Sequence, residues 1–209
     1  MTFPISLTLT GRRVLVVGGG PVGRRRAVAA ADAGAAVTVV APHTPPGGFA
    51  HPGVGWRAEP YHPDQLAGTT LVFAAAPAEV NAVVVADARA AGIWVCDAAD
   101  PDRGDFTTPA VARAGRLTLA VDTGGASPSL ARRIKTRLEG EYDSSYGTWV
   151  EVLGAVRAVI LAEIPASAAR RRLLDGFADW AWLDRSRAEG PDAVRAAMLA
   201  EVERVARGG

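Results

Sequence analysis

Short apolar runs alternate with longer, alanine-rich stretches through the first half of the chain. The run Arg13–Val17 is almost continuously apolar, and Ala36–Val40 repeats the pattern. Such runs are typical of strands that are covered on both faces. On these grounds strands are predicted at 13–17, 36–40, 55–60, 70–75 and 93–96, and helices at 21–33 and 78–91. Strands that alternate with helices at this spacing predict right-handed βαβ units in a parallel, doubly wound sheet.

The pattern changes after Pro101. The elements predicted there are strands at 111–113 and 117–121, a helix at 129–139, a polar break at 140–147, and helices from 148 onward that are interrupted near 165 and 190. Leu130, Ile134 and Leu138 recur every four residues in the first of these helices. This spacing predicts an apolar stripe that is buried against another element.

Composition narrows the classes of function. The chain has 209 residues, of which 49% are hydrophobic and 22% charged, and a net charge of +1. This balance is typical of globular proteins and gives no support for nucleic-acid binding. The sequence shows no apolar run of about 20 residues and no signal-peptide pattern, so no membrane association is expected. The single cysteine, Cys96, favours a cytoplasmic location, and one Cys with three scattered His predicts no resident metal.

The stretch Gly18-Gly19-Gly20-Pro21-Val22-Gly23 matches the pattern G-x-G-x-x-G between a predicted strand and a predicted helix. Gly18 permits a tight turn, Gly20 lets the backbone approach a pyrophosphate, and Gly23 allows the helix to pack closely on the sheet. Pro21 suits the first helical turn, where the N–H groups and the positive dipole end attract phosphate. This context favours a dinucleotide site over a turn that is merely tight. The candidate contacts are Gly18, Gly20, Pro21, Val22 and Gly23.

The predicted fold class is therefore α/β. It comprises an N-terminal Rossmann domain with a parallel sheet at 1–112, a small α/β domain at 113–147 and a helical C-terminal domain at 148–209.

The second predicted strand lacks the acidic residue that usually holds the ribose hydroxyls, because it ends in Val39-Val40-Ala41-Pro42. Backbone groups near Pro42, or the side chains of His43 and Thr44, would then contact the ribose. His43 is equally well explained as a solvated loop residue. No Arg follows the strand immediately to hold a 2′-phosphate, so NAD is preferred to NADP as the cofactor.

A second anion site is predicted at Thr123–Pro128, where small residues precede a helix. Ser127 suits the N-cap and Pro128 the first helical position, so N–H groups, two hydroxyls and the helix dipole meet there. The candidate contacts are Thr123, Gly124, Gly125, Ser127 and Arg132. For any single arginine of this helix, a solvated basic face on a well-capped helix is the alternative.

Four stretches together resemble the precorrin-2 dehydrogenase family, which includes the dehydrogenase and ferrochelatase module of sirohaem synthases. They are Gly11–Gly20, Thr38–Pro42, Phe106–Ala110 and Thr123–Pro128, within a likeness that covers residues 3–205. The resemblance implies the NAD-dependent oxidation of precorrin-2 to sirohydrochlorin, a tetrapyrrole edged with carboxylates. It also implies a homodimer formed through the middle domain, which makes 113–147 a dimerisation domain. Some members also chelate metal, so Fe²⁺ or Co²⁺ is a further candidate substrate.

The resemblance implies that a base or water takes a proton in the family reaction. A carboxylate near the macrocycle would serve as that general base, or would help to deliver Fe²⁺ in members that also chelate. The resemblance places it at Ala99, two residues before Pro101, where this chain has no acid. Asp100 is the first candidate for the role and Asp97 the second, because ligands of α/β sheets sit at the C-terminal ends of strands. Asp105 is a weaker third. Each of these aspartates is otherwise explained as a turn or helix-cap residue.

The missing acid at Ala99 also supports a second class of function. A non-catalytic NAD(H) sensor or a tetrapyrrole-binding protein would keep both anion sites without the general base. Asn81, at the start of the helix after the strand 70–75, is expected to support the preceding loop rather than to contact substrate.

Overall fold

The computed structural model describes residues 2–43 and 51–207. The chain divides into two compact units, Met1–Thr108 and Pro109–Gly209. Residues 109–112, which the sequence pattern assigned to the first domain, lie with the second unit. Residues 110–112 belong to a strand that pairs within that unit. The further division at residue 147 stays a prediction.

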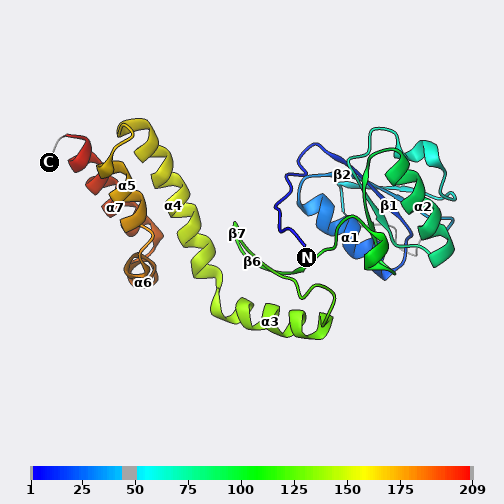
Figure 1. The fold of residues 1–209 in the computed structure, drawn as a ribbon. Coiled ribbons are helices and arrows are strands. Elements are labelled where there is room, and N and C mark those ends of the chain that lie inside the picture. Colours follow the sequence, from blue (N-terminus) through cyan, green and yellow to red (C-terminus); the bar gives the residue numbers. More distant parts are fainter. Residues whose placement is uncertain (1, 44–50, 208–209) are drawn as a thin grey trace. The chain divides into compact units, whose positions relative to one another are not determined.

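The first unit is built on a parallel five-stranded sheet with strand order β3-β2-β1-β4-β5. Figure 1 labels β1 and β2 of this sheet together with helices α1 and α2. Its strands are β1 (Arg13–Val17), β2 (Ala36–Val40), β3 (Val54–Arg57), β4 (Leu71–Ala74) and β5 (Trp94–Asp97). Its helices are α1 (Pro21–Asp32) and α2 (Ala78–Ala90), with single 3-10 turns at η1 (Pro63–Leu66) and η2 (Pro101–Arg103). The predicted α/β class and the order of its elements are confirmed.

Both faces of this sheet are covered, as the continuous apolar runs predicted. Val14 and Val16 pack on one face with the alanines of α1. Leu15 and Val17 pack on the other face with Val84 and other apolar residues of α2. The alternation of side chains along β1 thus feeds two separate hydrophobic clusters.

The order of the strands creates a topological switch point at the C-terminal end of the sheet. From β1 the chain crosses to β2 and β3 on one side, and it then returns to β4 and β5 on the other. Val17 is in register with both Val40 and Ala74, and Ala74 is in register with Asp97, so the C-terminal ends of four strands are level. The loops after β1 and β4 diverge at this switch point, which is where α/β sheets bind their ligands.

The second unit joins a two-stranded hairpin to a group of helices. Its elements are β6 (Ala110–Ala114), β7 (Leu117–Val121), α3 (Pro128–Glu141), α4 (Ser144–Glu163), α5 (Ala168–Gly176), α6 (Trp180–Glu189) and α7 (Pro191–Ala206). The predicted polar break at 140–147 is wrong, since only residues 142 and 143 separate α3 from α4. Polar residues in this stretch cap helix α4, because the carboxylate of Asp143, its N-cap residue, accepts a hydrogen bond from the Ser145 N–H.

The apolar stripe predicted on α3 is exposed in the chain taken alone. The exposed fractions of Leu130 and Ile134 are 50% and 36%. Within the described part of the unit, α3 has only the narrow β6–β7 hairpin to pack on, and Ala131 is its single buried residue. The expectation of a buried stripe was therefore wrong for the isolated chain.

Helix α4 is the core helix of the helical group. Val152, Val156 and Ile160 on one face pack with residues of α5 and α7, including Met198 and Leu173. Among the described residues, α4 is also the one helix long and apolar enough to cross a membrane by length and composition, which no run in the sequence was expected to be. Of that apolar window 28% is buried, and a single helix that passes this test does not establish a membrane span.

Candidate functional site

The glycine loop between β1 and α1 has the tight geometry that its sequence predicts. Gly18 has a φ of +111°, and a Cβ added there would lie 2.2 Å from the carbonyl oxygen of Ala75. A Cβ at Gly23 would lie 2.0 Å from the Gly18 oxygen. Gly20 differs, because no described atom lies within 4 Å of its Cβ position. The loop is thus packed against protein at its two ends and open at its centre, which suits the approach of a pyrophosphate.

The first turn of α1 is suited to an anion. Gly20 is its N-cap and makes no side-chain cap, Pro21 occupies the first position, and no acidic residue lies in the first turn. The N–H groups of a first turn, such as that of Val22, have no acceptor within the helix. Together with the helix dipole they form a site that fits a phosphate group.

The C-terminal end of β2 lies next to the glycine loop, since the Gly18 N–H donates to the Val40 oxygen over 2.8 Å. Pro42 and His43 follow that strand and are the last residues described before the gap, whereas Thr44 lies outside the described residues. In the sheet register Arg57 of β3 is the partner of Val40, and its Nη1 atom lies 3.5 Å from Glu59 Oε1. A cation that the sequence analysis did not single out therefore lies near the position expected for the ribose.

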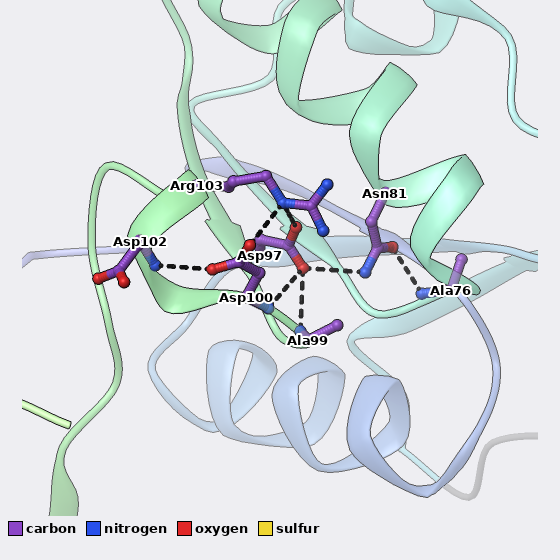
Figure 2. Close-up of polar contacts among 7 residues, drawn as sticks. All are labelled: Ala76, Asn81, Asp97, Ala99, Asp100, Asp102 and Arg103. Carbon is purple, nitrogen blue, oxygen red and sulfur yellow. Dashed lines mark hydrogen bonds and ion pairs between the residues drawn. The ribbon is translucent and has the colours of Figure 1, made fainter. Parts of the chain in front are cut away.

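Asp97, the last residue of β5, accepts hydrogen bonds from the loop that follows it (Figure 2). It is 1% exposed. Its Oδ1 atom accepts three hydrogen bonds, from Asn81 Nδ2 at 3.0 Å, from the Ala99 N–H at 2.9 Å and from the Asp100 N–H at 3.2 Å. Its other oxygen, Oδ2, is buried and has no hydrogen-bond partner among the described residues.

Asp100 lies at the start of η2 and is half-exposed. Its Oδ1 atom accepts from the Asp102 N–H at 3.2 Å, so it caps this turn as the structural alternative predicted. Its Oδ2 atom lies 2.9 Å from Arg103 Nε, and the same nitrogen lies 3.5 Å from Asp97 Oδ2. Arg103 is thus shared by the two carboxylates (Figure 2). The sequence analysis missed it, although an arginine three residues after a proposed acid in a proline-led turn was a readable signal.

Asn81 links this loop to the loop after β4. Its Oδ1 atom accepts from the Ala76 N–H at 2.9 Å while its Nδ2 group donates to Asp97. The expectation that Asn81 supports the β4–α2 loop is confirmed. The connection onward to Asp97 was not anticipated, because sequence alone does not place α2 against the end of β5.

Two neighbouring groups, Asp105 and Cys96, have surroundings that suit a structural role rather than a reactive one. Asp105 accepts from the Val95 N–H at 3.0 Å and lies 3.2 Å from Arg89 Nε, which ties its carboxylate to the side of the sheet. Burial raises the pKa of the Cys96 thiol, so this group stays neutral near physiological pH and is a poor nucleophile.

The second predicted anion site has a cap of the expected kind. The Ser127 hydroxyl accepts from the Leu130 N–H at 3.2 Å, and the Thr123 hydroxyl accepts from the Ser127 N–H at 3.1 Å. Each hydroxyl keeps its own hydrogen to donate. Gly124 and Gly125 have φ values of +58° and +80°, which is why glycines occupy this loop.

Arg132 lies on the exposed surface of α3 with Ser129, Arg133 and Thr136, around a shallow, open depression. The first turn of α3 contains no acidic residue. Asp122, just before the loop, accepts from the Gly124 N–H at 3.0 Å. The structure thus brings the candidate residues of this site together at one helix start, within the second unit.

In the described ranges 2–43 and 51–207, no three His, Cys, Asp or Glu side chains are grouped so that they could hold a metal ion.

The glycine loop, the open first turn of α1 and the acidic loop meet at the C-terminal edge of one parallel sheet. This fold and this edge define a Rossmann-type, dinucleotide-binding protein.

Comparisons with known proteins extend this assignment. A family described as putative NAD(P)-binding matches residues 5–110. A sirohaem synthase of Aeromonas hydrophila is 35% identical over 202 residues, which is 95% of this chain and 43% of the relative. A sirohaem synthase of Chromobacterium violaceum is 38% identical over an alignment 224 residues long, gaps included, that covers 99% of this chain and 44% of the relative. The chain therefore spans less than half the length of these curated relatives.

Among solved structures, the chain resembles one named SirC, precorrin-2 dehydrogenase. The TM-score is 0.71 and the identity 27%, over 97% of this chain and 100% of that one. The chain belongs to the putative NAD(P)-binding family. It is similar to sirohaem synthases and to a structure named as a precorrin-2 dehydrogenase, the group that its sequence motifs resemble.

Proposed function

We propose that this chain oxidises precorrin-2 to sirohydrochlorin with NAD⁺ as the acceptor. The observation that carries the proposal is the shared C-terminal end of one sheet, where an open dinucleotide loop follows β1 and a half-exposed carboxylate, Asp100, follows β5, with β4 between these two strands. The names of a similar solved structure and of the curated relatives support the same reaction.

The reaction removes two electrons and two hydrogens from the substrate. One hydrogen leaves as a hydride, which NAD⁺ would accept when bound, and the other leaves as a proton. Asp100 is the group we assign to hold that proton, because its carboxylate is half-exposed just after the C-terminal end of β5. Asp97 is fully buried and already accepts three hydrogen bonds, which favours a role in holding the loop.

The substrate carries acidic side chains, and the start of α3 suits them. Thr123, Gly124, Gly125, Ser127 and Arg132 are the residues we assign to these carboxylates. Their support is the cap geometry and the absence of acidic residues in the first turn of α3.

Incubation with precorrin-2 and NAD⁺ tests the proposal directly. We expect NADH absorbance to rise together with the formation of sirohydrochlorin. Binding of both ligands without NADH formation would instead support the second function, a non-catalytic NAD(H) sensor or tetrapyrrole-binding protein. The alanine at position 99, where an acid is expected, is the observation that supports this alternative. Adding Fe²⁺ or Co²⁺ to sirohydrochlorin and the protein tests whether chelation accompanies oxidation.

The preference for NAD over NADP is testable at Arg57. The Glu59 carboxylate lies beside the Arg57 guanidinium, so we expect its negative charge to oppose the binding of a 2′-phosphate there. NAD⁺ should bind more tightly than NADP⁺, and Arg57→Ala should change the NAD⁺ dissociation constant by less than about twofold, as an exposed ion pair contributes little. Tighter binding of NADP⁺ that disappears in Arg57→Ala would reverse the assignment. Titration monitored by protein fluorescence makes the measurement.

The assignment of Arg132 predicts a change confined to the tetrapyrrole. Arg132→Gln should raise the KM for precorrin-2 about tenfold, since a hydrogen bond to a charged group contributes roughly 1.5 kcal/mol or more. Affinity for NAD⁺ should not change. Arg137→Gln, further along the same helix, is the matched control for lost positive charge. Equal effects of the two substitutions would show general electrostatics rather than a contact at the helix start.

We also propose a homodimer and a cytoplasmic location. The exposed stripe of Leu130 and Ile134 beside a two-stranded hairpin leaves apolar surface that a second copy would cover. Gel filtration that gives a monomer would contradict the dimer.

A further inference from the structure

Asn81 occupies a position that packing alone does not explain. It is 0% exposed on the face of α2 that also buries Val84 and Val85 against the sheet. Burying an amide and a carboxylate costs free energy unless every polar atom is bonded. An apolar residue at this position would simply extend the core of the unit.

The contacts of Asn81 connect three loops of the proposed active site. Through Ala76 it holds the β4–α2 loop, whose Ala75 carbonyl packs against Gly18 of the cofactor loop. Through Asp97 it holds the backbone N–H groups of Ala99 and Asp100. The two sides that must meet for hydride and proton removal are therefore joined by one buried amide (Figure 2).

The carboxylate at the centre of this connection is only partly satisfied. Asp97 Oδ2 is buried and makes no hydrogen bond among the described residues. Its ion-pair partner, Arg103 Nε, lies 3.5 Å away and is closer to Asp100 Oδ2, at 2.9 Å. Half-satisfied buried groups are uncommon in a purely structural core and concentrate at functional sites.

From these contacts we infer that Asn81 is a positioning residue that sets the place of Asp100 relative to the cofactor loop, acting through Asp97. This inference rests on the proposed function for its catalytic consequence. Its structural part, that Asn81 holds these loops in place, can be tested without measuring the reaction.

Asn81→Asp tests the inference by changing one functional group. The new carboxylate still accepts from the Ala76 N–H, but it faces Asp97 without a donor. At low pH a proton shared by the pair restores the hydrogen bond, and at high pH the two charges repel. The other charged groups near the pair are Arg103 and Asp100 on η2, whereas Asp87 and Arg89 of α2 contact Tyr61 and Asp105.

We expect the ratio of kcat of Asn81→Asp to kcat of the wild type to fall at least tenfold between about pH 6 and about pH 9. Asn81→Ala should lower kcat by about 10- to 100-fold without this pH dependence, because a displacement near 1 Å costs about that much. The KM for NAD⁺ should change far less than kcat in both variants. Tyr61→Phe, which removes a hydrogen bond from Tyr61 to α2 outside the site, controls for simple loosening of the helix.

Amide hydrogen exchange supplies a readout that needs no turnover. In Asn81→Ala the N–H groups of Ala76, Ala99 and Asp100 should exchange at least about tenfold faster than in the wild type, with little change for Tyr61→Phe. Unchanged exchange, or folded variants with wild-type kcat, would overturn the positioning role. A wild-type protein that does not oxidise precorrin-2 would overturn the proposed function alone, because the exchange measurement would still decide the order of the loops.

Discussion

Asp100→Asn is expected to lower kcat for precorrin-2 oxidation by about 100-fold or more, which is the usual contribution of a positioned general base. Asparagine keeps an oxygen that can accept from the Asp102 N–H, so the cap of η2 survives. The substitution removes the basic oxygen beside Arg103. Steady-state kinetics and NAD⁺ titration together make the measurement, and the NAD⁺ dissociation constant should stay within about twofold.

Substitutions at two nearby carboxylates, Asp97 and Asp105, test whether the role of general base belongs to Asp100. Asp97→Asn keeps the Oδ1 acceptor of three hydrogen bonds, so it should retain more activity than Asp100→Asn if Asp97 only holds the loop. Asp105→Asn alters a carboxylate that is tied to Arg89 and the Val95 N–H, and kcat should hardly change. A larger loss in Asp97→Asn than in Asp100→Asn would move the base to Asp97.

The sequence predicted four strands of the sheet well because β1, β2, β4 and β5 are buried along most of their length, whereas the residues of β3 alternate between partly buried and exposed. Continuous apolar runs leave little choice of period or register, and the structure places all five predicted strands in one parallel sheet. The glycine loop was equally predictable, since backbone conformations such as that of Gly18 admit almost no other residue.

The acidic loop could not be predicted to the same degree. Periodicity cannot reveal that Asp97 belongs to the last position of β5 and faces inward, or that Asn81 approaches it from a helix sixteen residues earlier. These contacts depend on how α2 crosses the sheet, which short-range patterns do not encode. The α3 stripe failed for a related reason, because its spacing predicts an apolar contact without saying whether the contact lies within the chain.

The glycine loop yields a pair of alanine substitutions with opposite expected effects. Gly20→Ala adds a methyl group where no described atom lies within 4 Å, at a φ of −71° that alanine readily adopts. Its free energy of unfolding should change by less than about 1 kcal/mol. Affinity for NAD⁺ should fall at least about tenfold, or 1.4 kcal/mol, because the methyl group lies where the pyrophosphate approaches the backbone.

Gly23→Ala should instead destabilise the fold. Its Cβ would lie 2.0 Å from the Gly18 oxygen, a backbone atom that cannot turn aside, and α1 would have to move off the sheet. The expected loss of unfolding free energy is about 1–3 kcal/mol, as for other overpacked sites, measured by denaturant unfolding without cofactor.

If Gly20→Ala kept full affinity while folded, the open centre of the loop would not be where the pyrophosphate binds. Since the Gly20 position touches no described atom, a loss of affinity there without a loss of stability can be assigned to the ligand.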